Sequence, residues 1–230
     1  MAQVALIAGG TGGLGKAVSL AFLRRGDTVW VTYRKQQEFD DLRKEAADAA
    51  GRFHGQSIDV TQEAETRALV ENIEKTSGGL DILVNCVGGY AAGAKLWEFD
   101  PRAFEQMLSV NLRAGFMLCR AAVPAMLRQN RGAIVNIASK AAIDHAGGSA
   151  AYAASKAAAV AMIDSLAADL KGTDVRANSV LPTIIDTLAN RQAMPKADFS
   201  KWPKAEDIAK VILFLCGEDS ALINGASIVV

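Results

Sequence analysis

The chain has 230 residues, of which 50% are hydrophobic and 22% are charged, a composition that excludes a disordered or collagen-like protein. Its 25 basic and 25 acidic residues balance, so no net charge attracts nucleic acid or an anionic membrane. A chain of this length can bury one large core, and we expect a single domain over residues 1–230.

Short apolar runs alternate with longer segments of helical periodicity along the chain. The predicted strands are residues 4–8, 28–32, 52–58, 80–84, 133–138, 175–181 and 227–230. The predicted helices are residues 14–25, 36–50, 64–76, 104–128, 150–170 and 205–216. Near-continuous apolar strands are typical of sheets buried on both faces, so this alternation predicts an α/β fold with one doubly wound parallel sheet of about seven strands.

Residues 183–203 interrupt this alternation with a mixed pattern that includes Pro195 and Pro203. The segment is too long for an ordinary connection within a compact domain. We therefore expect it to act as a lid over a substrate.

The sequence also indicates a cellular location and several features that we expect the protein to lack. Cys86, Cys119 and Cys216 are scattered without CxxC spacing, which suits reduced thiols in a cytoplasmic protein. No uncharged apolar run reaches about 18 residues, and the start has no basic leader, so we expect neither a transmembrane helix nor a signal peptide. No cluster of His, Cys and Asp has metal-ligand spacing, so we expect no metal.

A glycine-rich turn directly follows the first predicted strand and opens the first predicted helix. Glycine permits positive φ and close approach of a ligand, and a helix N-terminus presents unpaired N–H groups and a positive dipole end. Together they predict a cradle for a pyrophosphate; a tight turn without a ligand is the alternative. The residues we assign to this cradle are Gly9, Thr11, Gly13, Leu14 and Gly15.

The same turn nearly matches the phosphate-binding loop of nucleoside triphosphatases. Gly10 and Gly15-Lys16 have the right spacing, but that motif continues with a Ser or Thr that binds magnesium, and Ala17 stands there. A phosphotransferase is therefore disfavoured.

The end of the second predicted strand indicates which dinucleotide binds. NAD-binding folds tend to place a carboxylate there to accept hydrogen bonds from the adenosine ribose. This chain instead has Arg34 and Lys35, and an arginine can bind a 2′-phosphate in a bidentate manner. The pattern favours NADP over NAD, and a solvated pair of cations is the alternative.

Tyr152 and Lys156 lie four residues apart in an alanine-rich helical segment, which puts them on one helix face. A lysine cation within about 4–6 Å lowers the pKa of a phenol from its usual value of about 10. That tuning serves general acid–base catalysis, although such a pair also occurs for purely structural reasons.

Together, these features resemble the short-chain dehydrogenase/reductase family over essentially the whole chain. The family's glycine motif is matched by Ala8-Gly9-x3-Gly13-Leu14-Gly15, with Ala8 in place of its threonine. Ser139 precedes Tyr152 by the family's usual interval of thirteen residues. The other matching segments are Asp59-Val60, Asn85-Cys86-Val87-Gly88, Val110-Asn111-Leu112 and the run from Arg176 to Pro182.

The resemblance implies a Rossmann-type fold and an NADPH-dependent oxidoreductase that passes a hydride to a small carbonyl substrate. Tyr152 would be the general acid, Ser139 would hydrogen-bond the same substrate atom, Lys156 would lower the tyrosine pKa and hold the nicotinamide ribose, and Asn111 would anchor a relay water. Beyond the glycine turn, the implied cofactor-binding residues are Arg34, Asp59, Val60, Asn85, Gly88, Tyr152, Lys156, Pro182, Ile184, Ile185 and Thr187. A homodimer or homotetramer is also implied.

The segment from Leu181 to Trp202 is similar to the C-terminal part of dihydropteridine reductases. In the family, Asn111, Ser139, Tyr152 and Lys156 would form the catalytic tetrad. The dihydropteridine reductase branch lacks the serine and asparagine of this tetrad and carries an acidic residue at the end of the second strand, unlike this chain. A quinonoid dihydropteridine reductase is therefore the alternative, and a non-catalytic dinucleotide sensor is a third possibility. The candidate substrate-contacting residues are Tyr90, His145, Met194 and Trp202.

Overall fold

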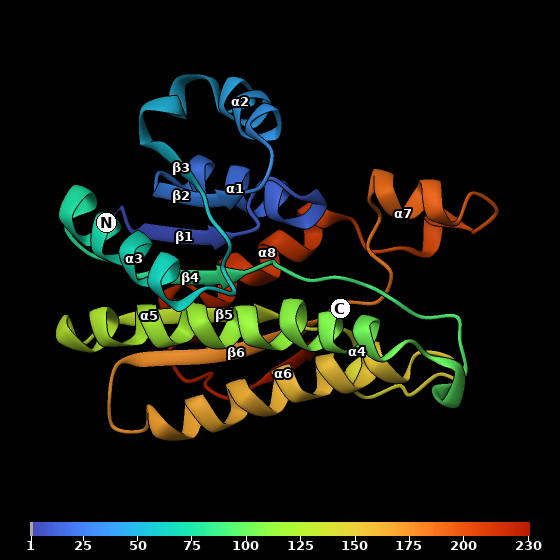
Figure 1. Cartoon of the computed structure of the whole chain (residues 1–230). Coiled ribbons are helices and arrows are strands. Elements are labelled where there is room, and N and C mark those ends of the chain that lie inside the picture. The colour runs from blue at the N-terminus through green and yellow to red at the C-terminus, as the bar shows by residue number, and fades with distance from the viewer. Residues whose placement is uncertain (1) are drawn as a thin grey trace.

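The computed structural model describes residues 2–230 (Figure 1). Within this range seven parallel strands form one sheet in the order β3-β2-β1-β4-β5-β6-β7. The strands are β1 (Val4–Ala8), β2 (Thr28–Tyr33), β3 (Phe53–Ser57), β4 (Ile82–Asn85), β5 (Gly132–Ile137), β6 (Val175–Leu181) and β7 (Ser227–Val229). The predicted doubly wound parallel sheet is confirmed, and its order reverses direction between β1 and β4, where folds of this kind bind ligands.

Helices cover both faces of the sheet (Figure 1). The α-helices of the described residues are α1 (Gly13–Arg25), α2 (Gln36–Glu45), α3 (Glu63–Ser77), α4 (Pro101–Leu108), α5 (Ala114–Arg128), α6 (Ala150–Asp169), α7 (Leu188–Ala193) and α8 (Ala205–Leu215). Helices α1, α2 and α8 pack on one face, and α3, α5 and α6 pack on the other.

The core divides into two clusters because side chains of a strand alternate between the faces. In β1, Ala5 and Ile7 belong to the cluster under α1 and α8, and Leu6 and Ala8 belong to the cluster under α3, α5 and α6. All four side chains are fully buried. Burial on both faces accounts for the uninterrupted apolar character of the central strands.

The edge strand β3 departs from this expectation. Its sequence runs Phe53 to Ser57, and only Phe53 is buried, because the edge strand has a neighbour, β2, on one side only. Two predicted helices also differ. The helix predicted over 36–50 ends at Glu45, since Ala47 adopts a positive φ of 46° and a 3-10 turn follows.

The helix predicted over 104–128 begins earlier and is not uniform. It starts at Pro101, where the Asp100 carboxylate accepts a hydrogen bond from the Arg102 N–H at 3.0 Å, a favourable N-cap. A π-helical turn, Ser109–Arg113, then separates α4 from α5. Such turns often occur at functional sites.

The continuous helical stretch Pro101–Arg128 is long and apolar enough to cross a membrane by length and composition alone. It is the one such helix in residues 2–230, and half of its most apolar window is buried inside the fold. Core helices of globular proteins pass the same test, so this is weak evidence for a membrane span.

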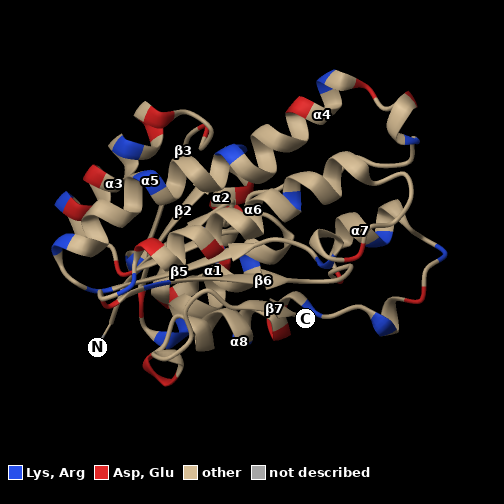
Figure 2. Ribbon diagram, turned by 90° about the horizontal axis from the view of Figure 1, so that it is seen from below, with Lys and Arg blue, Asp and Glu red and all other residues tan. Residues whose placement is uncertain are grey.

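Charged side chains of both signs are interspersed over the outer helices (Figure 2). Two ion pairs join α5 to α3, with Arg120 paired to Glu63 at 3.1 Å and Arg128 to Glu74 at 2.7 Å. Positive and negative side chains are therefore also close neighbours on this surface.

Residues 183–203 leave the end of β6 and include α7 and a 3-10 turn at Phe199–Lys201. Figure 1 shows α7 standing out from the body beyond the carboxyl end of the sheet. The segment rejoins the fold where Asp186 pairs with Lys204 in an isolated parallel bridge.

Candidate active site

The glycine turn lies at the carboxyl end of β1 and leads into α1. Gly9 has a positive φ of 71°, and a Cβ atom on Gly15 would collide with the carbonyl oxygen of Gly9. Helix α1 has no side-chain cap on Gly12 and no acidic residue in its first turn. Its N-terminal N–H groups and positive dipole end therefore suit an anionic group such as a dinucleotide pyrophosphate.

The end of β2 lies next to this turn, since the Thr32 hydroxyl accepts a hydrogen bond from the Gly9 N–H at 2.9 Å. Arg34 is exposed there. Lys35, which the sequence also offers as a phosphate-binding cation, is paired with Glu38 at 3.0 Å. Of the two cations, Arg34 is therefore the better candidate for a 2′-phosphate.

Asp59 follows β3 and carries a well-stabilised carboxylate. Hydrogen bonds from the Thr61 N–H at 2.9 Å and the Thr61 hydroxyl at 2.7 Å hold its pKa below the usual value, and the charge of Arg34 adds to this effect. Its neighbour Val60 is buried. Tyr33 pairs with Ser57 in the parallel register of β2 and β3, so Arg34 and Asp59 follow neighbouring strand ends at the same end of the sheet.

The loop after β4 is organised by Asn85. Its side-chain oxygen accepts a hydrogen bond from the Val87 N–H at 3.1 Å, and its amide donates to the Asn136 side chain at 2.8 Å. The loop then reaches Gly88, where an added Cβ would lie 3.1 Å from Asn111 Oδ1 and 3.1 Å from Lys156 Nζ. Two tetrad residues therefore converge on this glycine.

Asn111 lies in the π-helical turn, and its side chain joins three segments. Its Oδ1 accepts from the Gly89 N–H at 2.9 Å, and its Nδ2 donates to the Gly89 carbonyl at 3.1 Å and to Ser155 Oγ at 2.9 Å. The side chain thus connects the π turn to the β4 loop and to α6. Its expected role in anchoring a relay water stays a prediction.

Tyr152 and Lys156 lie on α6, as the helical spacing predicts. Lys156 is buried, and its ammonium donates to the Ile137 carbonyl at 3.0 Å. Burial lowers the pKa of Lys156 from 10.5 to about 8, because a low-dielectric surrounding disfavours the cation.

The expected lowering of the Tyr152 pKa by Lys156 is not found. Burial raises the pKa of Tyr152 above its usual value of 10, hydrogen bonding with the Ser139 side chain opposes this rise, and Tyr90 adds to it. The lysine ammonium is directed to the Ile137 carbonyl instead. Ser139 caps a 3-10 turn, and its Oγ accepts a hydrogen bond from the Ala141 N–H at 3.2 Å.

Two of the four candidate substrate residues make aromatic contacts. Tyr90 packs edge-on against Tyr152, with ring centroids 4.9 Å apart, and is 73% exposed. Trp202 packs instead on Phe199, at a centroid separation of 4.9 Å. Tyr90 is therefore the candidate that directly borders the phenol.

The other two candidates lie on different segments. His145 is exposed on the loop after Ser139, and Met194 is half-buried at the end of α7. The loop of His145 is joined to the loop of Tyr90 by a hydrogen bond from the Gly93 N–H to the Gly148 carbonyl at 2.8 Å. Two of the segments that carry substrate candidates are therefore connected.

The segment after β6 returns to the site. The Pro182 carbonyl accepts from the Lys140 N–H at 2.9 Å, next to Ser139. Thr187 caps α7 and lies against the glycine turn, 2.8 Å from the position of a Cβ on Gly13. Between them, Ile184 is exposed and Ile185 packs on the core.

Sequence reasoning missed several residues of the site. Thr32 binds the glycine turn, Asn136 holds Asn85, and Ser155 binds Asn111. A buried asparagine in an apolar strand was an available signal for Asn136, but nothing in the pattern marks Ser155. Within residues 2–230, the buried Asn136 Nδ2 and Ser179 Oγ have no hydrogen-bond partner.

Two other classes of site receive no support. In the part of the chain that the structure describes, no group of three or more His, Cys, Asp or Glu could hold a metal. Burial raises the pKa of Cys86, Cys119 and Cys216 to about 12, so these thiols are poor nucleophiles.

The comparisons with known proteins agree with this geometry. A family model described as short chain dehydrogenase matches residues 3–228, and the chain belongs to that family of oxidoreductases. It is 32% identical to the 3-oxoacyl-[acyl-carrier-protein] reductase FabG of Thermotoga maritima, over 97% of this chain and 94% of that protein. It is 31% identical to the D-threitol dehydrogenase of Mycolicibacterium smegmatis, over 99% and 91% of the two chains.

Solved structures show the same fold. The structure of ElxO with NADP bound has a TM-score of 0.94 and 27% identity, and the match covers 100% of this chain and 97% of that one. The similarity of residues 181–202 to dihydropteridine reductases stays a prediction.

Proposed function

We propose that this enzyme uses NADPH to reduce a small carbonyl compound, with Tyr152 as the general acid. The observation that carries the proposal is the position of the Tyr152 phenol. It borders the exposed Tyr90, its pKa responds to the Ser139 side chain, and it lies on the same helix as the buried Lys156. The ElxO structure with NADP supports the choice of dinucleotide, as does the exposed Arg34 at the end of β2.

The residues of the chain fit the parts of this dinucleotide. The N-terminus of α1 and the turn of Gly9, Gly13 and Gly15 would hold the pyrophosphate, and Arg34 would hold the 2′-phosphate. Asp59 and Val60 would border the adenine, and Asn85, Gly88 and the segment from Pro182 to Thr187 would border the nicotinamide half. When bound, NADPH supplies the hydride that a carbonyl carbon accepts.

The proton chemistry belongs to α6 and Ser139. Because burial raises the Tyr152 pKa, its phenol is protonated at neutral pH and can donate to the carbonyl oxygen. The Ser139 hydroxyl would hydrogen-bond the same oxygen and stabilise the charge that develops on it. Lys156, with a pKa of about 8, can change its charge near neutral pH and so take part in returning a proton to the phenol.

Substrate would enter from the side bordered by Tyr90 and His145, with residues 183–203 closing over it. We propose that Met194 and Trp202 approach the substrate in that closed state. Residues 1–230 then act as one dinucleotide-binding and catalytic domain, and the three free cysteines fit a cytoplasmic location.

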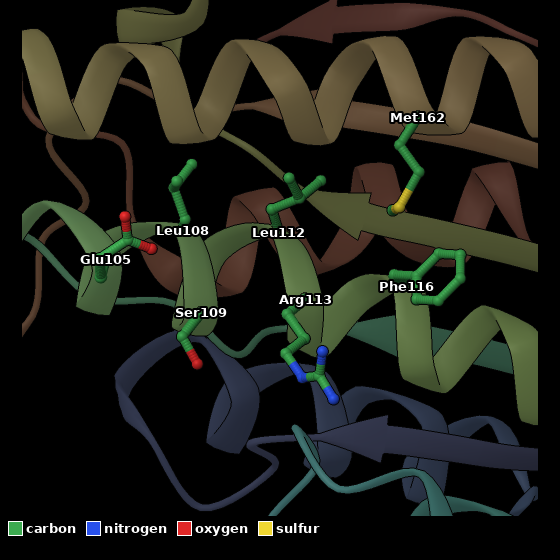
Figure 3. Close-up of a pocket in the computed structure, with 7 residues that line it drawn as sticks. All are labelled: Glu105, Leu108, Ser109, Leu112, Arg113, Phe116 and Met162. Carbon is green, nitrogen blue, oxygen red and sulfur yellow. The ribbon is translucent and has the colours of Figure 1, made fainter.

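We also propose that a second copy covers the groove between α6 and the α4–α5 helix, forming at least a homodimer (Figure 3). The groove is lined by Glu105, Leu108, Ser109, Leu112, Arg113, Phe116 and Met162. Phe116 is 47% exposed, and Glu105 and Arg113 carry opposite charges on one helical stretch, so a two-fold axis can pair them across an interface. Light scattering should give a dimer or tetramer for the enzyme and a monomer for Phe116→Glu.

The activity is tested by NADPH consumption with ketones, aldehydes, β-ketoacyl thioesters, quinones and quinonoid dihydropterin. Turnover of a carbonyl compound is the expected result. Turnover of the dihydropterin alone would establish the alternative reductase, and tight NADPH binding without turnover of any acceptor would favour a dinucleotide sensor.

A further inference from the structure

Glu38, in the first turn of α2, lies where the glycine turn meets the end of β2. Its Oε2 accepts a hydrogen bond from Thr11 Oγ1 at 3.3 Å. Its Oε1 pairs with Lys35 Nζ at 3.0 Å. One carboxylate therefore engages the hydroxyl of the glycine turn and one of the two cations that follow β2.

This position matters for a dinucleotide because of the fold. In doubly wound sheets the adenosine ribose lies at the carboxyl end of the second strand, beside the glycine turn. A 2′-phosphate there would be drawn to hydroxyl and ammonium donors. Glu38 occupies two such donors and adds a negative charge that repels a phosphate.

We propose that Glu38 is a specificity-determining residue that limits the preference for NADPH over NADH. It competes with the 2′-phosphate for Thr11 and Lys35, while Arg34 favours the phosphate. This inference rests on the proposed use of NADPH. All four side chains are on the surface, where solvent and salt screen charges, so the effect should be several-fold rather than many orders of magnitude.

The test compares dinucleotide binding by Glu38→Gln and by a matched control, Asp41→Asn. Asp41 lies on the same helix and is exposed, and its carboxylate is bonded to Gln37 at 2.9 Å and Lys44 at 3.4 Å. Both substitutions remove one negative charge from α2 while keeping the shape of the side chain. Only Glu38→Gln removes a charge that contacts Thr11 and Lys35.

Dissociation constants for NADPH and NADH are measured by titration calorimetry at low salt. Glu38→Gln should bind NADPH about three- to tenfold more tightly, with less than a twofold change for NADH, and Asp41→Asn should change neither by more than twofold. Adding Lys35→Gln to Glu38→Gln should remove most of the gain.

Three outcomes would overturn the proposal. They are an unchanged or weaker NADPH affinity in Glu38→Gln, an equal gain in Asp41→Asn, or an equal gain for NADH. Failure of the proposed function has a different signature, because the unmodified enzyme would then reduce no carbonyl compound with NADPH, whatever its affinities for the two dinucleotides.

Discussion

The methyl group of Thr187 lies against Gly13, so that a Cβ atom on Gly13 would be 2.8 Å from Thr187 Cγ2. The contact joins the glycine turn to the base of residues 183–203. In Gly13→Ala the new methyl must push the half-buried Thr187 away. We expect a lower melting temperature and NADPH binding weakened about tenfold, measured by thermal denaturation and calorimetry.

A second substitution tests whether this contact is the cause. Thr187→Ser removes Cγ2 but keeps the Oγ1 that accepts from the Asn190 N–H at 3.2 Å and caps α7. Gly13→Ala combined with Thr187→Ser should recover most of the lost affinity and stability. A double variant as impaired as Gly13→Ala alone would mean that the glycine is needed for another reason.

Tyr152→Phe should remove the proton donor while leaving the shape of the site intact. We expect kcat to fall by at least about 10²–10⁴, the usual contribution of a general acid. The NADPH dissociation constant should change less than about threefold, because the phenyl ring still packs against Tyr90. Steady-state kinetics and calorimetry on one preparation check both, and full activity in this variant would exclude Tyr152 as the acid.

The pKa of Lys156 predicts the pH dependence of reduction. Burial lowers this pKa to about 8, so the ammonium is charged at neutral pH and loses its charge as the pH rises through 8. Burial raises the pKa of Tyr152, so the phenol stays protonated over the same interval. We expect kcat/KM for reduction to be constant from about pH 6 to 7.5 and to fall above pH 8. A profile that stays flat to pH 10 would contradict this assignment.

Arg34 should set the affinity for the 2′-phosphate. It is exposed at the end of β2, and its positive charge contributes to the lowered pKa of Asp59. Arg34→Ala should weaken NADPH binding at least about tenfold, or about 1.4 kcal/mol, with little change for NADH. Lys44→Ala removes one positive charge from the neighbouring helix and serves as the control. An equal loss of affinity for NADPH and NADH would show that Arg34 does not bind the 2′-phosphate.

The central strands of the sheet could be predicted because apolar runs mark them directly. The π-helical turn could not, since the spacing from Ser109 to Arg113 fits an α-helix equally well, and its role depends on the contacts of Asn111 with Gly89 and Ser155. The early end of α2 depends on the backbone of Ala47, a residue type that ordinarily favours helix.

The candidate site also combines features that the sequence predicts with features that depend on the fold. Spacing correctly placed Tyr152 and Lys156 on one helix, but the direction of the Lys156 ammonium depends on the carbonyl of Ile137, which ends the preceding strand β5. Glu38 is likewise an ordinary surface residue in the sequence. Its significance comes from Thr11, which the fold brings close from 27 positions away.

Residues 183–203 are held by a chain of contacts centred on Arg191. Its guanidinium binds Asp186 through two hydrogen bonds of 2.6 and 2.8 Å and lies 4.9 Å from the ring centroid of Phe199, which in turn packs on Trp202. If this segment is the lid, backbone amides over residues 194–202 should exchange more slowly when NADPH and a substrate are both bound. Equal hydrogen exchange with and without substrate would count against a lid.

Arg191→Gln should loosen the same segment without weakening the core. Arg191 and Phe199 lie outside the buried core of the domain, and solvent-exposed ion pairs contribute little to global stability, so the melting temperature should change by less than about 2 °C. Exchange over residues 186–202 should accelerate, and KM should rise more than kcat falls, because an open lid holds substrate less well. Arg67→Gln removes an exposed ion pair with Glu71 on α3. It should change neither the hydrogen exchange of residues 186–202 nor the values of KM and kcat. Similar effects in the two variants would mean that Arg191 has no special connection to the lid.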